Sequence, residues 1–226
     1  MIVVGIITVL IVVTILIAAA FRMDWGVYLN SYCREKSIKE GGIMITFDDG
    51  PHSKYTEEVL DVLKKRGVKA LFFLIGERAL ENPQLVRRIA EEGHIIGIHS
   101  LRHTIDFTIS SRIRVVDDLK ATKRILEELS GQNIRLFRPP FGVTNPQIGR
   151  AVNDLDLLSV GWSIRSFDTL SSSDIHRTLK RVKRRIDDGA ILLLHDRLPQ
   201  SANLLENILD YMKLNGYEAK IFKRVL

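Results

Sequence analysis

A single cysteine, Cys33, occurs among the 226 residues of the sequence. One cysteine cannot form an intramolecular disulfide, so the redox state of the protein's compartment cannot be read from a bridge. Internal repeats and low-complexity tracts are also lacking, which argues against a repeat architecture. With 46% hydrophobic residues, the chain can bury a full-sized core. Beyond the first two dozen residues we expect one domain, with no second catalytic module.

Charged residues are absent from positions 2–21, where the sequence reads IVVGIITVLIVVTILIAAAF. This apolar run matches the roughly 20 residues that an α-helix needs to cross a bilayer. We therefore expect a single-pass transmembrane anchor over residues 1–22. A cleaved signal peptide is the alternative, because Ala18, Ala19 and Ala20 resemble a cleavage site. The length of the run and the lack of a preceding Lys or Arg favour the retained anchor.

The formal net charge of +6 could indicate an anionic partner. However, the densest basic stretch, Arg177–Arg185, interleaves its charges with apolar residues at helical spacing. This pattern is typical of a solvated helix face, with attraction to anionic glycans or lipid headgroups as the alternative. We expect neither a nucleic acid nor a protein partner.

After a polar segment at 23–42, which we interpret as a linker, short β-branched or aromatic runs alternate with amphipathic stretches. Strands are expected at 43–47, 70–75, 94–98, 134–137, 158–162, 190–194 and 218–222. Helices are expected near 55–66, 83–92, 112–130, 145–153, 174–188 and 201–215. This alternation predicts an α/β domain over 43–226, with parallel strands and crossover helices in an open sheet or a closed barrel.

Polar residues directly follow four of the predicted strands. Asp48 and Asp49 follow IMITF, His99 follows HIIGI, Arg138 follows RLF, and His195 and Asp196 follow ILLL. In α/β sheets and barrels, ligands bind at the carboxyl ends of the strands. We therefore expect the four segments to bring acids, bases and a cation to one site. Taken singly, each of these residues could instead mark only the exit of a strand to solvent.

The residue types at these strand ends suit a catalytic metal. The two carboxylates, together with His99 and His103, supply the oxygen and imidazole ligands that bind zinc or a similar ion. Water at an open position of such an ion has a lowered pKa, and a carboxylate can take its proton as it attacks a carbonyl carbon. Either Asp48 or Asp49 could be that base, and His195 is a candidate proton donor. The alternative for the histidine pair is two surface imidazoles at a helix start.

Four motifs carry a family resemblance: TFDDGP (46–51), HSLRH (99–103), RPPFG (138–142) and LLLHD (192–196). In this order they resemble the motifs of the NodB-homology polysaccharide deacetylases, carbohydrate esterase family 4. The resemblance covers about residues 43–222. It implies a distorted (β/α) barrel of the NodB-homology type, here preceded by the N-terminal transmembrane helix.

The resemblance also implies roles for single positions. It implies Asp48 as general base, His195 as general acid, and Asp49, His99 and His103 as metal ligands. Arg138 would orient the base, Asp168 would pair with the acid histidine, and the backbone N–H of Phe141 would donate to the oxyanion. Pro139, Leu193 and Trp162 are the implied substrate-binding positions. The implied metal is divalent, with Zn favoured and Co or Ni as alternatives.

One segment departs from the family pattern. The chain reads WSIRSFDT at 162–169, where the family often has a tryptophan followed by Asp-x-x-Asp-Trp. Arg165 and Thr169 therefore replace the first aspartate and the final tryptophan. Because this segment shapes the groove for the sugar, the identity of the substrate is not carried over from any relative.

Together these features predict a hydrolase that removes acetyl groups, N-acetyl favoured, from a glycan such as peptidoglycan, a chitin-like oligosaccharide or a surface polysaccharide. The alternatives are an O-acetyl xylan esterase, a small-amide hydrolase, or an inactive membrane-anchored glycan-binding protein. Family substrates lie outside the cytoplasmic membrane, so we expect an extracytoplasmic catalytic domain. The positive charges that follow the span favour the opposite side.

Overall fold

A nine-stranded sheet forms the centre of the fold, and its strand pairs are parallel. The computed structural model describes residues 1–38, 41–170 and 174–226. The strand order is β1-β6-β5-β4-β3-β2-β8-β7, with β9 paired to β2. The bounds are β1 (Ser31–Tyr32), β2 (Gly42–Gly50), β3 (Leu71–Leu74), β4 (Ile95–Ile98), β5 (Leu136–Phe137), β6 (Leu158–Val160), β7 (Ile164–Arg165), β8 (Ile191–His195) and β9 (Glu218–Ala219). Within the described residues, no strand pairing joins β1 to β7, so the curled sheet is an open barrel.

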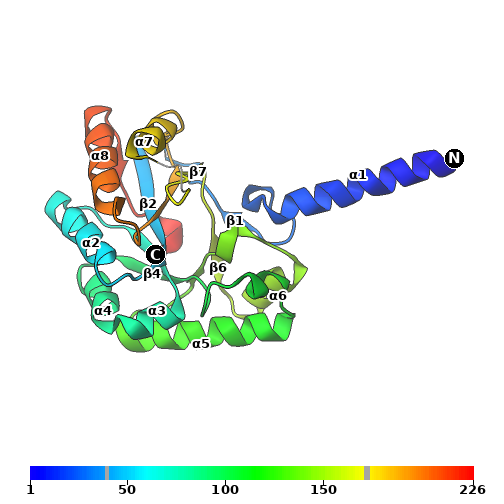
Figure 1. Ribbon diagram of the computed structural model, residues 1–226, viewed down its shortest axis with the longest axis horizontal. Helices are drawn as coiled ribbons and strands as arrows, with labels where there is room; N and C mark the ends of the chain where they lie inside the picture. The colour runs from blue at the N-terminus through cyan, green and yellow to red at the C-terminus, as the bar shows by residue number, and fades with distance from the viewer. Residues whose placement is uncertain (39–40, 171–173) are drawn as a thin grey trace.

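Helices lie around the outside of this barrel (Figure 1). They are α2 (Tyr55–Arg66), α3 (Gly76–Glu81), α4 (Pro83–Glu91), α5 (Arg112–Ser130), α6 (Pro146–Asp154), α7 (Ile175–Lys183) and α8 (Ser201–Leu214). Short 3-10 helices are η1 (Met23–Trp25), η2 (Ile105–Ile109), η3 (Pro140–Gly142) and η4 (Lys223–Val225). The parallel strands and intervening helices confirm the predicted α/β barrel. The sequence patterns did not predict α3, β1 or β7.

Alternation of side chains along β2 separates two faces of the sheet. Ile43, Ile45 and Phe47 belong to the main core between the sheet and the helices. Met44 belongs to a smaller apolar cluster on the other face, inside the barrel. Because successive side chains of a strand point to opposite faces, Asp48 also falls on the inner face. The strand therefore carries its first carboxylate into the mouth of the barrel.

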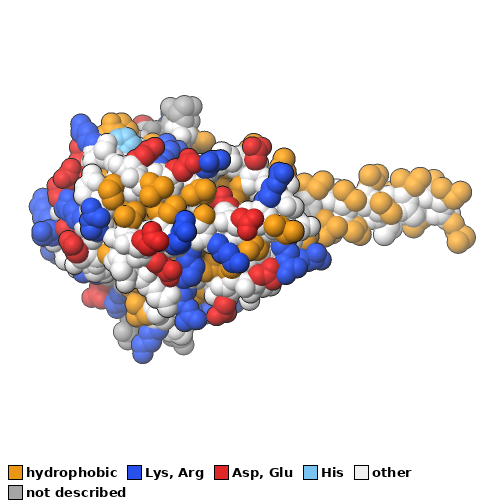
Figure 2. All heavy atoms as spheres, turned by 90° about the horizontal axis from the view of Figure 1, so that it is seen from below, with side chains coloured by type: hydrophobic (Ala, Val, Ile, Leu, Met, Phe, Trp, Pro, Cys, Tyr) orange, Lys and Arg blue, Asp and Glu red, His pale blue; other side chains and the backbone are white. Residues whose placement is uncertain are grey.

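The N-terminal helix α1 (Ile2–Ala20) projects away from the barrel (Figure 1). It has a mean hydropathy of 3.2, and only 6% of its apolar window is buried. Figure 2 shows hydrophobic side chains along this helix, whereas charges of both signs are scattered over the visible face of the barrel. Length and composition make α1 a candidate membrane span or signal sequence.

The segment after α1 packs against the barrel. Ala20 O accepts a hydrogen bond from the backbone N–H of Thr144 at 2.8 Å. Strand β1 pairs with β6, and Tyr32 is buried. The sequence predicts a linker at 23–42. In the structure, residues 23–38 of this segment lie in large part along the edge of the sheet. The boundaries at residues 22 and 42 stay predictions.

Acid should destabilise the fold through His94, which precedes β4 and is buried. Its Nδ1 accepts the backbone N–H of Ala70 at 3.2 Å, and Nε2 has no hydrogen-bond partner. Burial, followed by the charge of Lys69, lowers the pKa of His94 to about 4. The unfolded chain, with a histidine pKa of about 6.5, therefore takes up this proton first as the pH falls.

We expect the free energy of unfolding to fall by up to about 3 kcal/mol from this histidine between pH 6.5 and pH 4. Urea unfolding at several pH values measures this slope. His94→Gln should flatten it, whereas His176→Gln, at an exposed position, should not. An equal slope in wild type and His94→Gln would contradict the assignment.

Candidate metal and catalytic site

A β-bulge brings the two adjacent aspartates to one site. The register of β2 against β3 shifts between Asp48 and Gly50. Asp49 has a left-handed backbone conformation there, with φ 71°. In a regular strand its carboxylate would point away from that of Asp48, and the bulge removes this alternation. As a result, His99 Nε2 lies 3.8 Å from Asp48 Oδ2 and 3.4 Å from Asp49 Oδ1.

Asp49, His99 and His103 form a cluster with the geometry of a metal site. One donor atom from each lies within 4.8 Å of the other two. His103 Nε2 is 3.3 Å from Asp49 Oδ1, an oxygen that is buried without a hydrogen-bond partner. A buried carboxylate oxygen without a partner is costly unless a cation completes it. The donor set therefore fits a divalent ion held by one carboxylate and two imidazoles.

The pKa values of Asp49 and His103 also suit the binding of a metal ion. Burial opposes the charge of Asp49, but the neighbouring imidazoles outweigh burial and hold the pKa of this carboxyl below its usual range. Burial, followed by the proximity of His99, lowers the pKa of His103 to about 4, which leaves that imidazole neutral at pH 7. His99 Nδ1 lies 2.8 Å from the Arg138 carbonyl oxygen. With Nδ1–H donating to that carbonyl, Nε2 keeps its lone pair for a metal.

Arg138 fixes the orientation of Asp48 through a buried ion pair. The arginine is fully buried, and its Nη1 donates to Asp48 Oδ1 at 2.6 Å and to Thr46 Oγ1 at 2.8 Å. Its Nε and Nη2 donate to the carbonyl oxygens of Val160 and Gly161 at 2.9 and 2.7 Å. A guanidinium fixed by four acceptors leaves the Asp48 carboxylate little freedom to reorient.

A second carboxylate orients His195 at the end of β8. His195 Nδ1 is 2.8 Å from Asp168 Oδ1, and the His195 backbone N–H donates to Asp168 Oδ2 at 2.9 Å. Burial would lower the pKa of His195, but the hydrogen bond to Asp168 and the charges of Asp168, Asp48 and Asp49 outweigh burial and raise it. Nε2 lies 3.9 Å from Asp49 Oδ2. The raised pKa favours the imidazolium form, whose Nε2–H would face the cluster.

The other predicted positions surround this centre. The ring of Phe141 lies 4.4 Å from that of His103, and Phe141 has a left-handed φ of 60°. Leu193 is buried on β8 two residues before His195, hence on the same strand face. Pro139 is buried next to Arg138, whose guanidinium lies 5.6 Å from the Trp162 ring. The structure therefore brings all the predicted site residues to one end of the barrel.

Left-handed backbone conformations concentrate at this site. Asp49, His103 and Phe141 all have positive φ, at 71°, 54° and 60°. For residues with a Cβ this conformation costs on the order of 1 kcal/mol or more, and it is enriched at functional sites. Ser100, between the two histidines of the cluster, has φ 66° and accepts the His103 backbone N–H at its hydroxyl. The HSLRH loop is thus held in a strained shape that directs both imidazoles at Asp49.

The sequence patterns missed Arg197 and placed Asp196 at a strand end without giving it a role. Arg197 Nε donates to Asp49 Oδ2 at 2.8 Å, so the second oxygen of this carboxylate, which lies 3.9 Å from His195 Nε2, is also held. Asp196 is buried, accepts the Thr56 hydroxyl at 2.6 Å, and lies where a side chain at Gly50 would fall. Burial raises the pKa of Asp196 to about 7. The available signal was the position of both residues directly after the LLLH strand end.

Replacing Arg197 with Gln should weaken metal binding by about 10- to 100-fold, because outer-shell partners orient the ligand carboxylate. Competition with a chromophoric chelator for Zn or Co measures the dissociation constant. Arg87→Gln is the matched control: Arg87 is exposed on α4 and has no ion pair among the described residues. An unchanged dissociation constant for Arg197→Gln would show that Arg197 does not position the Asp49 carboxylate for metal binding.

Comparison with known proteins places this site in a family. The polysaccharide deacetylase family model matches residues 35–160. The chain is 36% identical over 176 residues to the peptidoglycan-N-acetylglucosamine deacetylase PgdA of Listeria monocytogenes, covering 78% of this chain and 37% of that protein. It is 33% identical over 206 residues to the peptidoglycan-N-acetylmuramic acid deacetylase PdaA of Bacillus subtilis, covering 87% and 78%. The solved Bc1960 peptidoglycan N-acetylglucosamine deacetylase matches with a TM-score of 0.79 at 28% identity, covering 87% and 92%.

The open parallel barrel, with an Asp-His-His cluster at the carboxyl ends of its strands, defines a class of α/β barrel proteins with a candidate divalent-metal site. Within that class, the chain belongs to the polysaccharide deacetylase family. It spans 37% of the length of the Listeria relative.

Proposed function

We propose that the protein is a metal-dependent hydrolase that removes N-acetyl groups from an amino-sugar glycan, with peptidoglycan as the favoured substrate. One observation carries this proposal: the Asp49, His99 and His103 cluster lies between a fixed carboxylate, Asp48, and a fixed imidazole, His195. A base and an acid on either side of one centre are what amide hydrolysis requires.

The residues divide the reaction as follows. A divalent ion held by the Asp-His-His cluster would supply a Lewis acid that activates water and stabilises charge on a carbonyl oxygen. Asp48, oriented by Arg138, accepts the proton of the attacking water. The backbone N–H of Phe141 donates to the oxyanion as the carbonyl carbon becomes tetrahedral. His195, protonated and held by Asp168, delivers a proton to the leaving amine.

Zn is the favoured ion, and Co or Ni are alternatives. Two imidazoles and one carboxylate are typical of zinc sites, and three protein ligands leave positions for water and substrate. The same donors also bind other late first-row divalent metals. The three protein ligands therefore favour a late first-row divalent metal as the bound ion.

The substrate proposal rests on the relatives and on the mouth of the barrel. Two curated relatives are named as deacetylases of the two amino sugars of peptidoglycan. We propose that Pro139, Leu193 and Trp162 line the acetyl and sugar subsites. Arg165 and Thr169 replace the family's aspartate and tryptophan next to these positions, so the outer groove should recognise its glycan differently from these relatives.

We further propose that α1 is a retained single-pass anchor and that the barrel lies on the extracytoplasmic side of the membrane. The apolar face of α1 is almost wholly exposed, as expected of a helix surrounded by lipid. A glycan polymer substrate outside the membrane supports the extracytoplasmic side.

The test of the proposed activity is metal-dependent acetate release by the full chain in detergent. The protein is stripped with a chelator, reloaded with Zn, Co or Ni, and assayed on peptidoglycan fragments, chitooligosaccharides and acetylxylan. We expect acetate and a free amino sugar from peptidoglycan fragments, only after reloading. Reloaded protein that binds glycan without releasing acetate, or that cannot be reloaded, would overturn the proposal.

A further inference from the structure

A cationic pocket of about 830 Å³ lies at the open seam of the barrel, between the edge strands β1 and β7. Ser31, Tyr32 and Cys33 line it from the β1 side, and Ser163 and Arg165 from the β7 side. An isolated bridge between Arg34 and Ala190 joins the chain across the seam at one end. The residues around the pocket include none of the proposed metal ligands, although the pocket shares Trp162 with the proposed substrate-binding positions and therefore adjoins that groove.

Cations outnumber carboxylates around this pocket. The cationic lining residues are Arg22, Arg34, Lys36, Arg165, Arg185 and Arg224, and the acidic ones are Asp24 and Glu35. Both carboxylates are already engaged: Asp24 pairs with Arg22 at 2.7 Å, and Glu35 accepts the Tyr32 hydroxyl at 2.7 Å. In the described part of the chain, no carboxylate lies within ion-pair distance of Arg165, Arg185 or Arg224. Arg34 is itself paired with Asp187 at 2.7 Å. The surplus of positive charge in the pocket therefore comes mainly from Arg165, Arg185 and Arg224.

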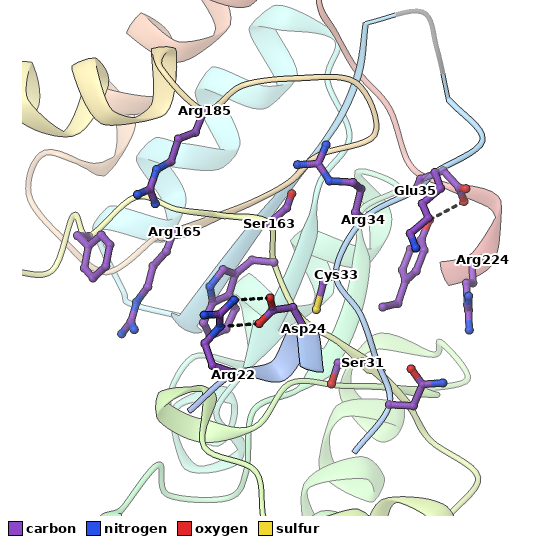
Figure 3. A pocket seen from close by; sticks show the side chains of 15 residues that line it. Arg22, Asp24, Ser31, Cys33, Arg34, Glu35, Ser163, Arg165, Arg185 and Arg224 are labelled. Atoms are coloured by element: carbon purple, nitrogen blue, oxygen red, sulfur yellow. Dashed lines mark hydrogen bonds and ion pairs between the residues drawn. The ribbon is translucent and has the colours of Figure 1, made fainter. Parts of the chain in front are cut away.

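The arrangement of the arginines fits a compact oxyanion. Figure 3 shows Arg165 and Arg185 on one side of the pocket and Arg34 on the other, with Ser163 between them. The Arg165 guanidinium lies 5.6 Å from the Trp162 ring and 4.9 Å from the Phe167 ring. Stacking on aromatic rings holds a guanidinium in place, and its planar donors match the oxygens of a phosphate. Hydroxyl groups beside such donors add neutral hydrogen bonds to the same ligand.

The position of the pocket relative to α1 indicates where that phosphate comes from. Helix α1 has 19 residues, which at 1.5 Å per residue match the hydrocarbon thickness of a bilayer, roughly 30 Å. Its end at Ala20 therefore falls at the level of the lipid headgroups. Arg22, two residues later, is part of the pocket wall. Exposed Phe21 and Trp25 flank it and are typical of a membrane interface.

We propose that the seam pocket binds an anionic phospholipid headgroup, whose phosphate charge is not offset by a choline as in phosphatidylcholine, and thereby holds the barrel against the bilayer. This inference rests on the proposed role of α1 as the membrane anchor, and is independent of the proposed catalysis. The covalent tether keeps the pocket at a high effective concentration of headgroups, so weak contacts suffice. The anionic surface of a membrane attracts clustered arginines next to a span in the same way.

Cys33 offers a direct probe, because this single cysteine lines the pocket and is partly exposed. The full chain is incorporated into nanodiscs of phosphatidylcholine alone or with phosphatidylglycerol, and the rate of maleimide labelling is measured. We expect phosphatidylglycerol to slow labelling of the wild type at least threefold. Arg165→Gln/Arg185→Gln should label at the same rate in both lipids.

The control variant is Arg87→Gln/Lys213→Gln, which removes two exposed charges from α4 and α8. It has the same net charge as the pocket variant, so it should keep the lipid effect if the pocket is responsible. Equal labelling of the wild type in both lipids would overturn the proposal. Millimolar inorganic phosphate that protects Cys33 as well as phosphatidylglycerol does would assign the pocket to a free anion instead.

Incorporation into nanodiscs, followed by size-exclusion chromatography, checks the anchor separately. Protein that stays outside the discs would overturn the anchor and this inference together. Acetate release by the same sample reports on catalysis. If the protein is active and incorporated but its Cys33 labelling rate does not depend on the lipid, only the proposed headgroup binding by the pocket is contradicted.

Discussion

Replacing Asp48 with Asn should lower the rate of acetate release by about 10²- to 10⁴-fold, the usual contribution of a general base. Asp48 Oδ1 is tied to Arg138 at 2.6 Å, and Oδ2 faces the ligand cluster, 3.8 Å from His99 Nε2. An amide of the same shape fills this place but cannot accept a proton from water. None of the three proposed ligands changes, so the variant should still bind metal.

The measurement pairs initial rates on peptidoglycan fragments with metal content by mass spectrometry. Asp156→Asn is the matched control, since the side chain of Asp156 is 93% exposed and lies outside the site. It should keep both the rate and the metal. Loss of metal in Asp48→Asn would move this residue into the ligand set, and an unchanged rate would assign the base elsewhere.

The main elements of the fold were predictable because their patterns are long. The strand predicted at 43–47 and the helix predicted at 112–130 correspond to β2 (Gly42–Gly50) and α5 (Arg112–Ser130). Strands β1 and β7 each have two residues, too few for an alternating pattern to show. Their pairing is decided by contacts with β6 and β8, which local sequence does not encode.

The site was predictable at the strand ends and unpredictable where it depends on tertiary contacts. The inward positions of Asp48 and His195 follow directly from the alternation of side chains along β2 and β8. The bulge at Asp49 leaves no local signature, because the strand reads as continuous in the sequence. The Arg197 contact joins residues 148 positions apart. Such a contact exists only once β2 and β8 lie side by side.

Removing the buried guanidinium should be the most destabilising single change at the site. Arg138→Met leaves Asp48 as a buried charge without its partner, which typically costs about 3–5 kcal/mol. It also leaves the carbonyl oxygens of Val160 and Gly161 without the hydrogen bonds that Arg138 donates. Urea unfolding followed by tryptophan fluorescence measures the loss, since Trp162 lies beside Arg138. Arg135→Met, at a 65% exposed side chain, should change stability by about 0.5 kcal/mol or less.

The double variant Asp48→Asn/Arg138→Met separates the structural role of this pair from its chemical role. Because the buried carboxylate is then neutral, the double variant should be less destabilised than the sum of the two single variants. Its rate of acetate release should nevertheless stay as low as that of Asp48→Asn, because no base has been restored. Additive stability changes would mean that Asp48 and Arg138 are not coupled. Recovery of stability without recovery of activity would identify Arg138 as the residue that keeps an ionised base inside the barrel.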